Sequence, residues 1–313
     1  MLRKRKTIQN RYNPSRGAQN TRFKLVVLLV VIVAAICAVI TASVLGKNAK
    51  KSALDSYGRH NLVSYGGTDE PAEDYAALRD LQAVYVGVSG MDKGNFRSSV
   101  SRLDNCNAVA FSVNDTDGKL FVSFESLGRL ITPITADADI TAEDIADVAK
   151  DEGKISIAYF YSKALAEEDS ATRALMIGEE IAMMTELANG GVNEIAVRGI
   201  KAFDNMEYVR AYFNLMEAAC ESTNICVVID KDALENADVT KIISATEGYA
   251  DAYSLNMSEI GNDQLGDAIE RNAYFITNYN ARIMVFEADE EEKTAETLAI
   301  LESYGIKSYE FVK

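Results

Sequence analysis

Several acidic residues come directly after short apolar segments, the position at which barrel enzymes carry their catalytic groups. Asp230 and Glu287 are the strongest pair, because they end the otherwise apolar stretches ICVVID and RIMVFE. Hydrolysis of a glycosidic bond needs two carboxylates facing one linkage, about 5 Å apart for retention and about 6.5–9.5 Å apart for inversion. We therefore predict Asp230 and Glu287 as catalytic candidates.

Other residues near the same segment ends have a structural interpretation beside the functional one. Asp115 and Asp117 are typical of a turn, and Asp232 of a helix cap. The run of acids from Glu287 to Glu292 favours the start of a helix. Glu310 is a substrate-binding candidate or the ion-pair partner of Arg198 or Lys201, while Tyr159 and Tyr161 either stack on a sugar ring or pack in the barrel.

Other chemistries lack their residues. The chain has one histidine, His60, so a histidine-dependent catalytic triad is excluded, and no Cys or His spacing indicates zinc. Cys220 and Cys226 could form a disulfide, but the apolar surroundings favour two buried thiols. No glycine-rich dinucleotide fingerprint follows the first strand, and no cofactor is implied.

Eight apolar segments, which alternate with amphipathic ones, are predicted to position these residues. Each is short and rich in Val, Ile, Tyr and Phe, as buried parallel strands are. The predicted strands cover 83–88, 108–113, 155–161, 194–200, 224–230, 251–257, 281–287 and 306–312. Eight strand–helix repeats predict an α/β fold of the (β/α)8 TIM-barrel type, with a doubly wound open sheet as the main alternative.

The helices between these strands have readable ends. Asn95 is expected to cap the first, a Thr141–Asp144 capping box begins the next, and Asp238 caps a later one. Further helices are predicted to begin at Ser170 and over 205–221, 262–275 and 290–304. The turn Asn114–Gly118 predicts a hairpin whose returning strand is 119–124. The eighth helix is expected to be missing, with a helix at 70–80 covering that flank.

The N-terminal region indicates a membrane anchor. Residues 25–45 form 21 residues without a charge, and the eight Lys or Arg in residues 1–24 have no acid among them. This pattern predicts one transmembrane helix with a basic cytoplasmic tail, a stalk with a short helix over 46–80, and an extracellular barrel over 81–313. A cleaved signal peptide is the alternative, but Thr41–Ser43 is a poor cleavage site.

The net charge of the chain limits the kinds of molecule that it can bind. The whole chain carries −15 and residues 1–24 contribute +8, so the remainder carries −23. Such an acidic domain repels phosphate backbones, which excludes nucleic acid as a partner.

A family resemblance rests on the stretch LQAVYVGVSG through SFES and continues to DAYSLNM. It is similar to a bacterial family of exported glycoside hydrolases whose TIM barrel is related to those of chitinases and alpha-amylases. The matching features are Tyr85 on strand one, the Asn107-Ala108-Val109 entry to strand two, and the acidic turn before Gly118. The resemblance implies carbohydrate chemistry at the barrel mouth, with Tyr85, Arg198 and Asn256 as substrate-binding candidates.

The departures from that family indicate a divergent form that could be inactive. Where the family has a D-E-I-Q-F-D-Y run on strand four, this chain has Asn193 to Gly199, and Arg198 stands in place of the second Asp. The Pro and Tyr residues that follow the family's strand six are absent after Asn256.

Three functions are therefore compared. The first is a membrane-anchored extracellular glycoside hydrolase acting on cell-envelope polysaccharide. The second is an inactive barrel that binds glycan or serves as a structural or partner-binding module of the envelope. The third, a sensor, has 24 cytoplasmic residues with which to signal and is the weakest.

Overall fold

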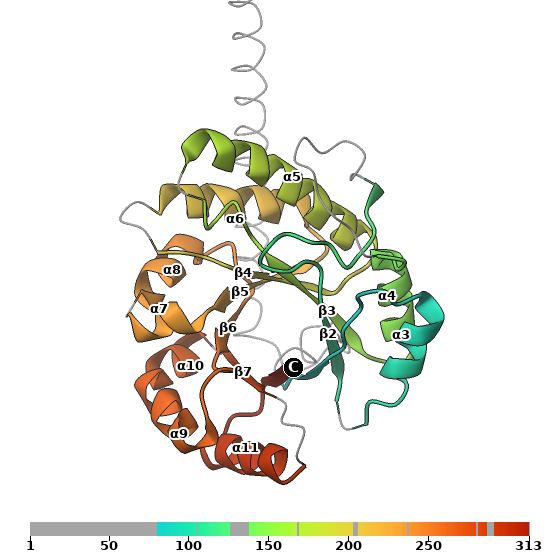
Figure 1. Ribbon diagram of the computed structural model, residues 1–313. Helices are drawn as coiled ribbons and strands as arrows, with labels where there is room; N and C mark the ends of the chain where they lie inside the picture. The colour runs from blue at the N-terminus through green and yellow to red at the C-terminus, as the bar shows by residue number, and fades with distance from the viewer. Residues whose placement is uncertain are drawn as a thin grey trace, which may run out of the picture. The chain divides into compact units, whose positions relative to one another are not determined.

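The computed structural model describes residues 80–104, 106–125, 138–167, 169–202, 206–236, 238–279, 281–286 and 291–312 (Figure 1). The predicted transmembrane segment 25–45, the stalk and the helix at 70–80 lie outside this described part. Within it, no helix combines the length and the hydropathy that a membrane span requires.

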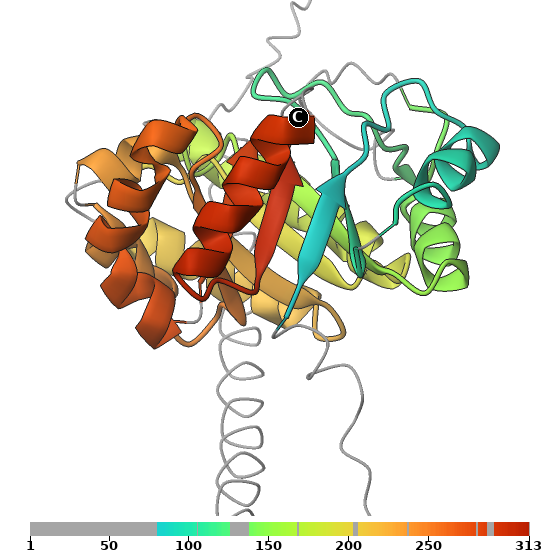
Figure 2. The same ribbon diagram turned by 90° about the horizontal axis from the view of Figure 1, so that it is seen from below.

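Eight strands among the described residues close into one barrel in the order β1 to β8, and each pairs in parallel with its neighbours (Figures 1 and 2). Every predicted strand forms within three residues of its predicted ends. The strands are β1 (Gln82–Tyr85), β2 (Ala108–Ser112), β3 (Ile155–Tyr161), β4 (Glu194–Arg198), β5 (Asn224–Ile229), β6 (Ala252–Asn256), β7 (Arg282–Phe286) and β8 (Tyr309–Val312). The closed order confirms the TIM barrel and rules out the open sheet.

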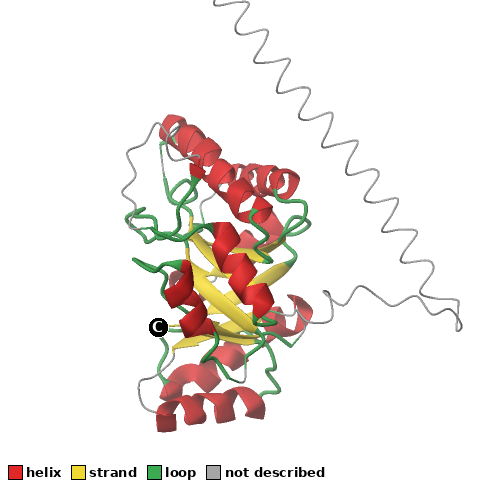
Figure 3. Ribbon diagram, turned by 90° about the vertical axis from the view of Figure 1, so that its right-hand side faces the viewer, coloured by secondary structure: helices red, strands yellow, loops and turns green. Residues whose placement is uncertain are grey.

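Helices lie outside the strands and connect them, so that apolar side chains on the outward faces of the strands are covered (Figures 1 and 3). They are α3 (Lys93–Val100), α4 (Ala142–Asp151), α5 (Ser170–Asn189), α6 (Glu207–Ala219), α7 (Lys231–Glu235), α8 (Val239–Thr246), α9 (Asn262–Arg271), α10 (Ala273–Tyr279) and α11 (Glu291–Ser303). The helix predicted over 262–275 is divided into α9 and α10. Asn272 marks the break, because its side-chain amide donates to the Ala268 carbonyl in the last turn of α9.

The structure agrees with some of the predicted helix caps and not with others. Thr141 and Asp144 form the predicted capping box. Asn95 is not the cap of α3, because Asp92 accepts the hydrogen bond from the Asn95 amide at 2.8 Å. Asp238 is the N-cap residue of α8, as predicted, but its side chain makes no cap hydrogen bond and pairs instead with Lys241 at 3.0 Å. The prediction of Asn95 is wrong because Asp92, three residues earlier, already accepts from the start of α3.

The predicted hairpin after β2 forms, but its returning strand is short. The Asp115 side chain accepts from the Lys119 amide at 2.8 Å, and Asn114 bridges Leu120 in antiparallel fashion. The segment then leaves its partner, because the Ser123 amide donates to the Ile140 carbonyl. The prediction of a full strand over 119–124 is therefore wrong.

The interior of the barrel contains a buried charged group. Arg282 of β7 forms a bidentate ion pair with Glu194 of β4, and its Nε lies 3.3 Å from Glu310 Oε1 of β8. A terminal nitrogen of Arg282 also lies 2.9 Å from the Cys226 sulfur. The exposed fractions of Glu194, Arg282 and Glu310 are 0%, 3% and 0%, so solvent does not reach them.

Mostly small side chains make room for this group. The strand register defines three consecutive interior layers, consisting of Ala108, Glu194, Ala252 and Ser308; Ala83, Ile157, Cys226 and Arg282; and Ala110, Ala196, Ser254 and Glu310. Barrel interiors are usually filled by bulky branched residues. Here the long Arg282 side chain fills the centre of the barrel instead.

Candidate functional site

Three polar residues meet where β4, β5 and β6 end. Arg198 is the last residue of β4, Asp230 follows β5, and Asn256 is the last residue of β6. Because these strands are adjacent and parallel, their C-terminal ends open at the same mouth of the barrel. The sequence placed all three among its site candidates, and the fold brings them into direct contact.

Asp230 is the acceptor at the centre of this cluster. Its Oδ1 accepts from Arg198 at 3.0 Å and from the Asn256 amide at 2.9 Å, while Oδ2 accepts from the Gly199 amide at 3.2 Å. The side chains of Arg198 and Asp230 are 34% and 29% exposed, so the pair remains open to the mouth. Asp230 therefore fixes the orientation of Arg198 and Asn256, and both of its oxygens are already in use.

Gly199 permits this arrangement. Its φ of +81° is in the left-handed region, where side chains are strained, and a Cβ there would lie 2.9 Å from the Tyr161 ring. With glycine, the backbone amide can turn toward Asp230 while the Tyr161 ring lies against it.

Asn256 extends the cluster toward the loop after β6. Its Oδ1 accepts from the Ser258 hydroxyl at 2.6 Å and from the Ser258 amide at 3.2 Å. The chain of contacts Arg198–Asp230–Asn256–Ser258 thus runs across three strand ends. Ser258 was not among the predicted site residues, because a single serine after a strand does not indicate a contact of this kind.

The aromatic candidates differ in accessibility. Tyr85 and Tyr161 are partly exposed at the ends of β1 and β3, where a ligand can reach them. Tyr159 is 3% exposed and packs within the barrel, so its structural interpretation is the better one. Phe286, which the sequence analysis did not select, is 52% exposed at the end of β7.

Glu310 is not at the mouth. Its carboxyl group is completely buried and lies beside Arg282, so the expected pairing with Arg198 or Lys201 is wrong. The side chain points inward two layers below that of Arg198, out of reach of a ligand in the mouth. The sequence does hold a clue to this neighbour of Glu310, because Arg282 is a charged residue in an otherwise apolar strand.

Burial raises the pKa of Glu310 to about 8. Arg282 Nε is near, but it does not donate a hydrogen bond to Glu310, and its charge is already balanced by Glu194. Burial alone would lower the pKa of Arg282, but the Glu194 carboxylate overrides this effect and raises it. The group therefore consists of the Arg282–Glu194 ion pair and a Glu310 carboxyl whose protonated form is favoured by burial.

Glu287, the predicted partner of Asp230, lies outside the described residues, as does Asp289. Asp115 is committed to its turn, and the backbone carbonyl of Asp117 accepts from Lys163. Glu259, beyond Ser258, is 73% exposed and pairs with Lys231 at 3.6 Å. Within the described ranges, Asp230 is thus the carboxylate that the fold holds at the junction of β4, β5 and β6.

The thiols carry no chemistry at the mouth. Cys220 and Cys226 are free and buried, as the sequence favoured. Burial raises the pKa of Cys220 to about 11 and that of Cys226 to about 12, so both remain protonated and unreactive at neutral pH. In the described part of the chain, no cluster of His, Cys, Asp and Glu could hold a metal ion.

No protein-family model and no curated protein sequence matches the chain. Solved structures do match. A protein assigned as an alpha-L-fucosidase from Bacteroides thetaiotaomicron is 10% identical, with a TM-score of 0.52 over 80% of this chain and 91% of that one. A family 10 glycoside hydrolase xylanase from Thermobacillus composti is 14% identical, with a TM-score of 0.47 over 76% of this chain and 85% of that one.

A D-psicose 3-epimerase is also 14% identical, with a TM-score of 0.47 over 74% of this chain and 83% of that one. The match to the fucosidase structure shows a shared barrel fold and nothing of the reaction. This fold agrees with the one that the resemblance implied.

Proposed function

We propose that this chain is an extracellular barrel, anchored by residues 25–45, that binds cell-envelope polysaccharide at its mouth without cleaving it. One observation carries the proposal, namely that both oxygens of Asp230 already accept hydrogen bonds from Arg198, Gly199 and Asn256. A carboxylate bound in this way positions its donors. Its oxygens are engaged by these donors, so it is less available than a free carboxylate to attack a sugar or to transfer a proton.

The cluster suits recognition of a sugar. Arg198 and Asn256 present fixed polar groups, and the partly exposed Tyr85 and Tyr161 supply flat apolar surfaces. A few convergent polar groups beside aromatic side chains are the usual composition of a small-molecule site. Because Asp230 orients the donors before a ligand arrives, binding loses little conformational entropy.

The charge pattern of the N-terminal region supports the same proposal. The basic tail in residues 1–24 favours a cytoplasmic N-terminus, which would export the barrel to the side on which the envelope polysaccharide lies. The acidic remainder of the chain repels anionic surfaces, which favours a glycan over a phosphate-rich partner.

Glycoside hydrolysis is the second candidate, because the side chain of Asp230 is 29% exposed at a barrel mouth, where a carboxylate can act as a nucleophile. This mechanism needs an acid about 5 Å away, the role predicted for Glu287.

The test combines binding and cleavage measurements on the full chain in detergent. Purified chain is incubated with cell-wall and capsular polysaccharides, and affinity and new reducing ends are measured separately. We expect binding without new reducing ends, and we expect Asp230→Ala to weaken binding by about 10-fold or more, because charged hydrogen bonds contribute about 1.5–3 kcal/mol.

Asp232→Asn serves as the matched control, since Asp232 is exposed on α7 and should leave binding unchanged. Release of reducing ends by the natural chain, lost in Asp230→Asn, would establish the hydrolase instead.

A further inference from the structure

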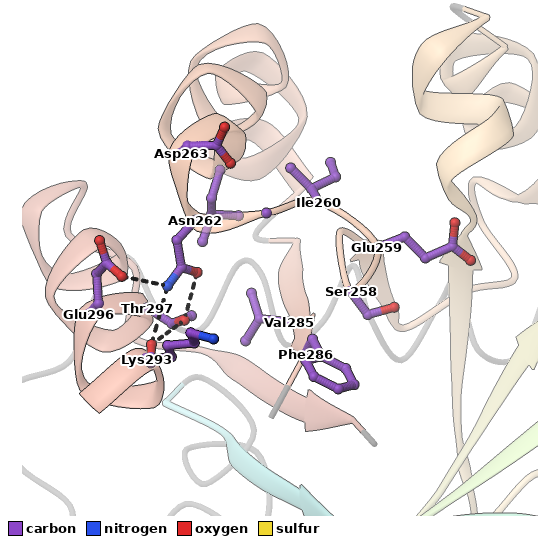
Figure 4. A pocket seen from close by; sticks show the side chains of 12 residues that line it. Ser258, Glu259, Ile260, Asn262, Asp263, Val285, Phe286, Lys293, Glu296 and Thr297 are labelled. Carbon is purple, nitrogen blue, oxygen red and sulfur yellow. Dashed lines mark hydrogen bonds between the residues drawn. The ribbon is translucent and has the colours of Figure 1, made fainter. Parts of the chain in front are cut away.

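A pocket lies next to the cluster of Arg198, Asp230 and Asn256, between the loop after β6, the end of β7 and helix α11 (Figure 4). Its volume is about 670 Å³, within the range of about 300–1,000 Å³ typical of small-molecule sites. Figure 4 shows Asn262, Glu296 and Thr297 together on one side, and Ser258 and Phe286 on the other.

Hydrogen bonds hold one wall of the pocket in place. The Asn262 amide donates to the Lys293 carbonyl at 3.2 Å and to Glu296 at 3.1 Å, while its oxygen accepts from the Thr297 hydroxyl at 2.9 Å. These bonds join the start of α9 to α11. The wall is therefore formed before any ligand binds.

Phe286 gives the pocket an apolar surface. It is 52% exposed, although it ends a strand whose preceding residues are buried. Leaving a phenylalanine ring in water forgoes its burial free energy, so an exposed ring in a concave site is the feature a ligand would cover.

The pocket continues the mouth cluster through Ser258. This residue lines the pocket, and its hydroxyl donates to Asn256, whose amide donates in turn to Asp230. Contacts of 2.6 Å and 2.9 Å thus join the two sites without a break.

We infer that this pocket is a second subsite of the glycan site, in which Phe286 stacks on an uncharged sugar unit of a chain that continues into the mouth. The inference rests on the proposed function. It adds the path of the glycan, from the pocket into the mouth, and the chemical class of its sugar units.

Charge selects the class of sugar. Glu259, Asp263 and Glu296 line the pocket together with Lys293, and Lys231 pairs with Glu259, so acidic groups remain in excess there. Arg198 in the mouth is neutralised by Asp230. A uronic acid or a phosphorylated sugar would meet like charges there. Neutral units such as N-acetylhexosamines meet none.

The experiment measures the affinity of the full chain in detergent for chito-oligosaccharides of two to six units, with oligogalacturonates as the acidic comparison. We expect Phe286→Ala to weaken hexamer binding by about 10-fold and to leave dimer binding at the mouth unchanged. Phe286→Tyr should retain the affinity. Tyr274→Ala, which removes another exposed ring on α10, is the control and should have no effect.

The outcomes separate the two proposals. If Phe286→Ala binds the hexamer as tightly as the natural chain while Asp230→Ala loses it, the second subsite is wrong and the mouth stands. If Phe286→Ala loses the hexamer and Asp230→Ala does not, the mouth is wrong and the pocket stands. Preference for oligogalacturonate overturns the uncharged class, and failure to bind either series overturns the second subsite, whereas binding of cell-wall and capsular polysaccharides decides the proposal for the mouth.

Discussion

The buried Glu310 carboxyl should make the stability of the barrel fall as pH rises, and Glu310→Gln should remove that dependence. Burial raises its pKa from 4.5 to about 8. Between these values the folded chain holds a proton that the unfolded chain has released, so the free energy of unfolding falls with increasing pH. Above about pH 8 both states are ionised and the loss is complete.

The size of the effect follows from the same two pKa values. A difference of about 3.5 corresponds to about 5 kcal/mol, at about 1.4 kcal/mol per pH unit. Arg282 Nε, 3.3 Å from the carboxyl oxygen, favours the charged form and reduces this figure. We therefore expect a loss of about 2–4 kcal/mol between pH 5 and pH 9 from this group, since part of the effect lies below pH 5.

The assay is urea unfolding of the full chain in a nonionic detergent at pH 5, 6, 7, 8 and 9, followed by the fluorescence of its 15 tyrosines. Burial also raises the pKa of Glu180, which adds a slope of the same sign to both proteins. The quantity to compare is therefore the difference between Glu310→Gln and the natural chain. It should be near zero at pH 5 and grow to favour the variant at pH 9.

Glu235→Gln, an exposed acid on α7, is the matched control and should follow the natural chain at every pH. A constant difference between Glu310→Gln and the natural chain across this range would refute the reasoning, because Glu310 would then be equally ionised in the folded and unfolded states.

Three further substitutions test the core, the mouth and a helix start. Arg282→Met should cost about 3–5 kcal/mol in the same urea titration, because it leaves the Glu194 charge buried without a partner; a loss below about 1 kcal/mol would contradict the ion pair. Gly199→Ala should destabilise the fold by about 1–2 kcal/mol and weaken glycan binding, because its Cβ displaces Tyr161; unchanged affinity would separate Tyr161 from the site. Thr141→Ala should cost about 1 kcal/mol through loss of the capping box of α4, and Thr141→Ser should restore most of it.

The sequence determined the architecture because periodicity and helix ends are local properties. Eight apolar segments alternating with amphipathic ones predicted every strand of the barrel, and the Thr141 capping box was predicted for the same reason. Local pattern also placed Asp230 at a strand end, and hence at the mouth of the barrel, whereas Arg198 and Asn256 were selected through the family resemblance.

Tertiary structure alone decided which side chains meet. Glu194 and Arg282 are separated by 88 residues, and Arg198 and Asp230 by 32, so no local pattern links either pair. Their contacts depend on the register between strands, and a shift of one residue would turn each side chain to the opposite face of the barrel. For that reason the sequence assigned Glu310 to the mouth, whereas the closed ring of strands carries it inward to Arg282.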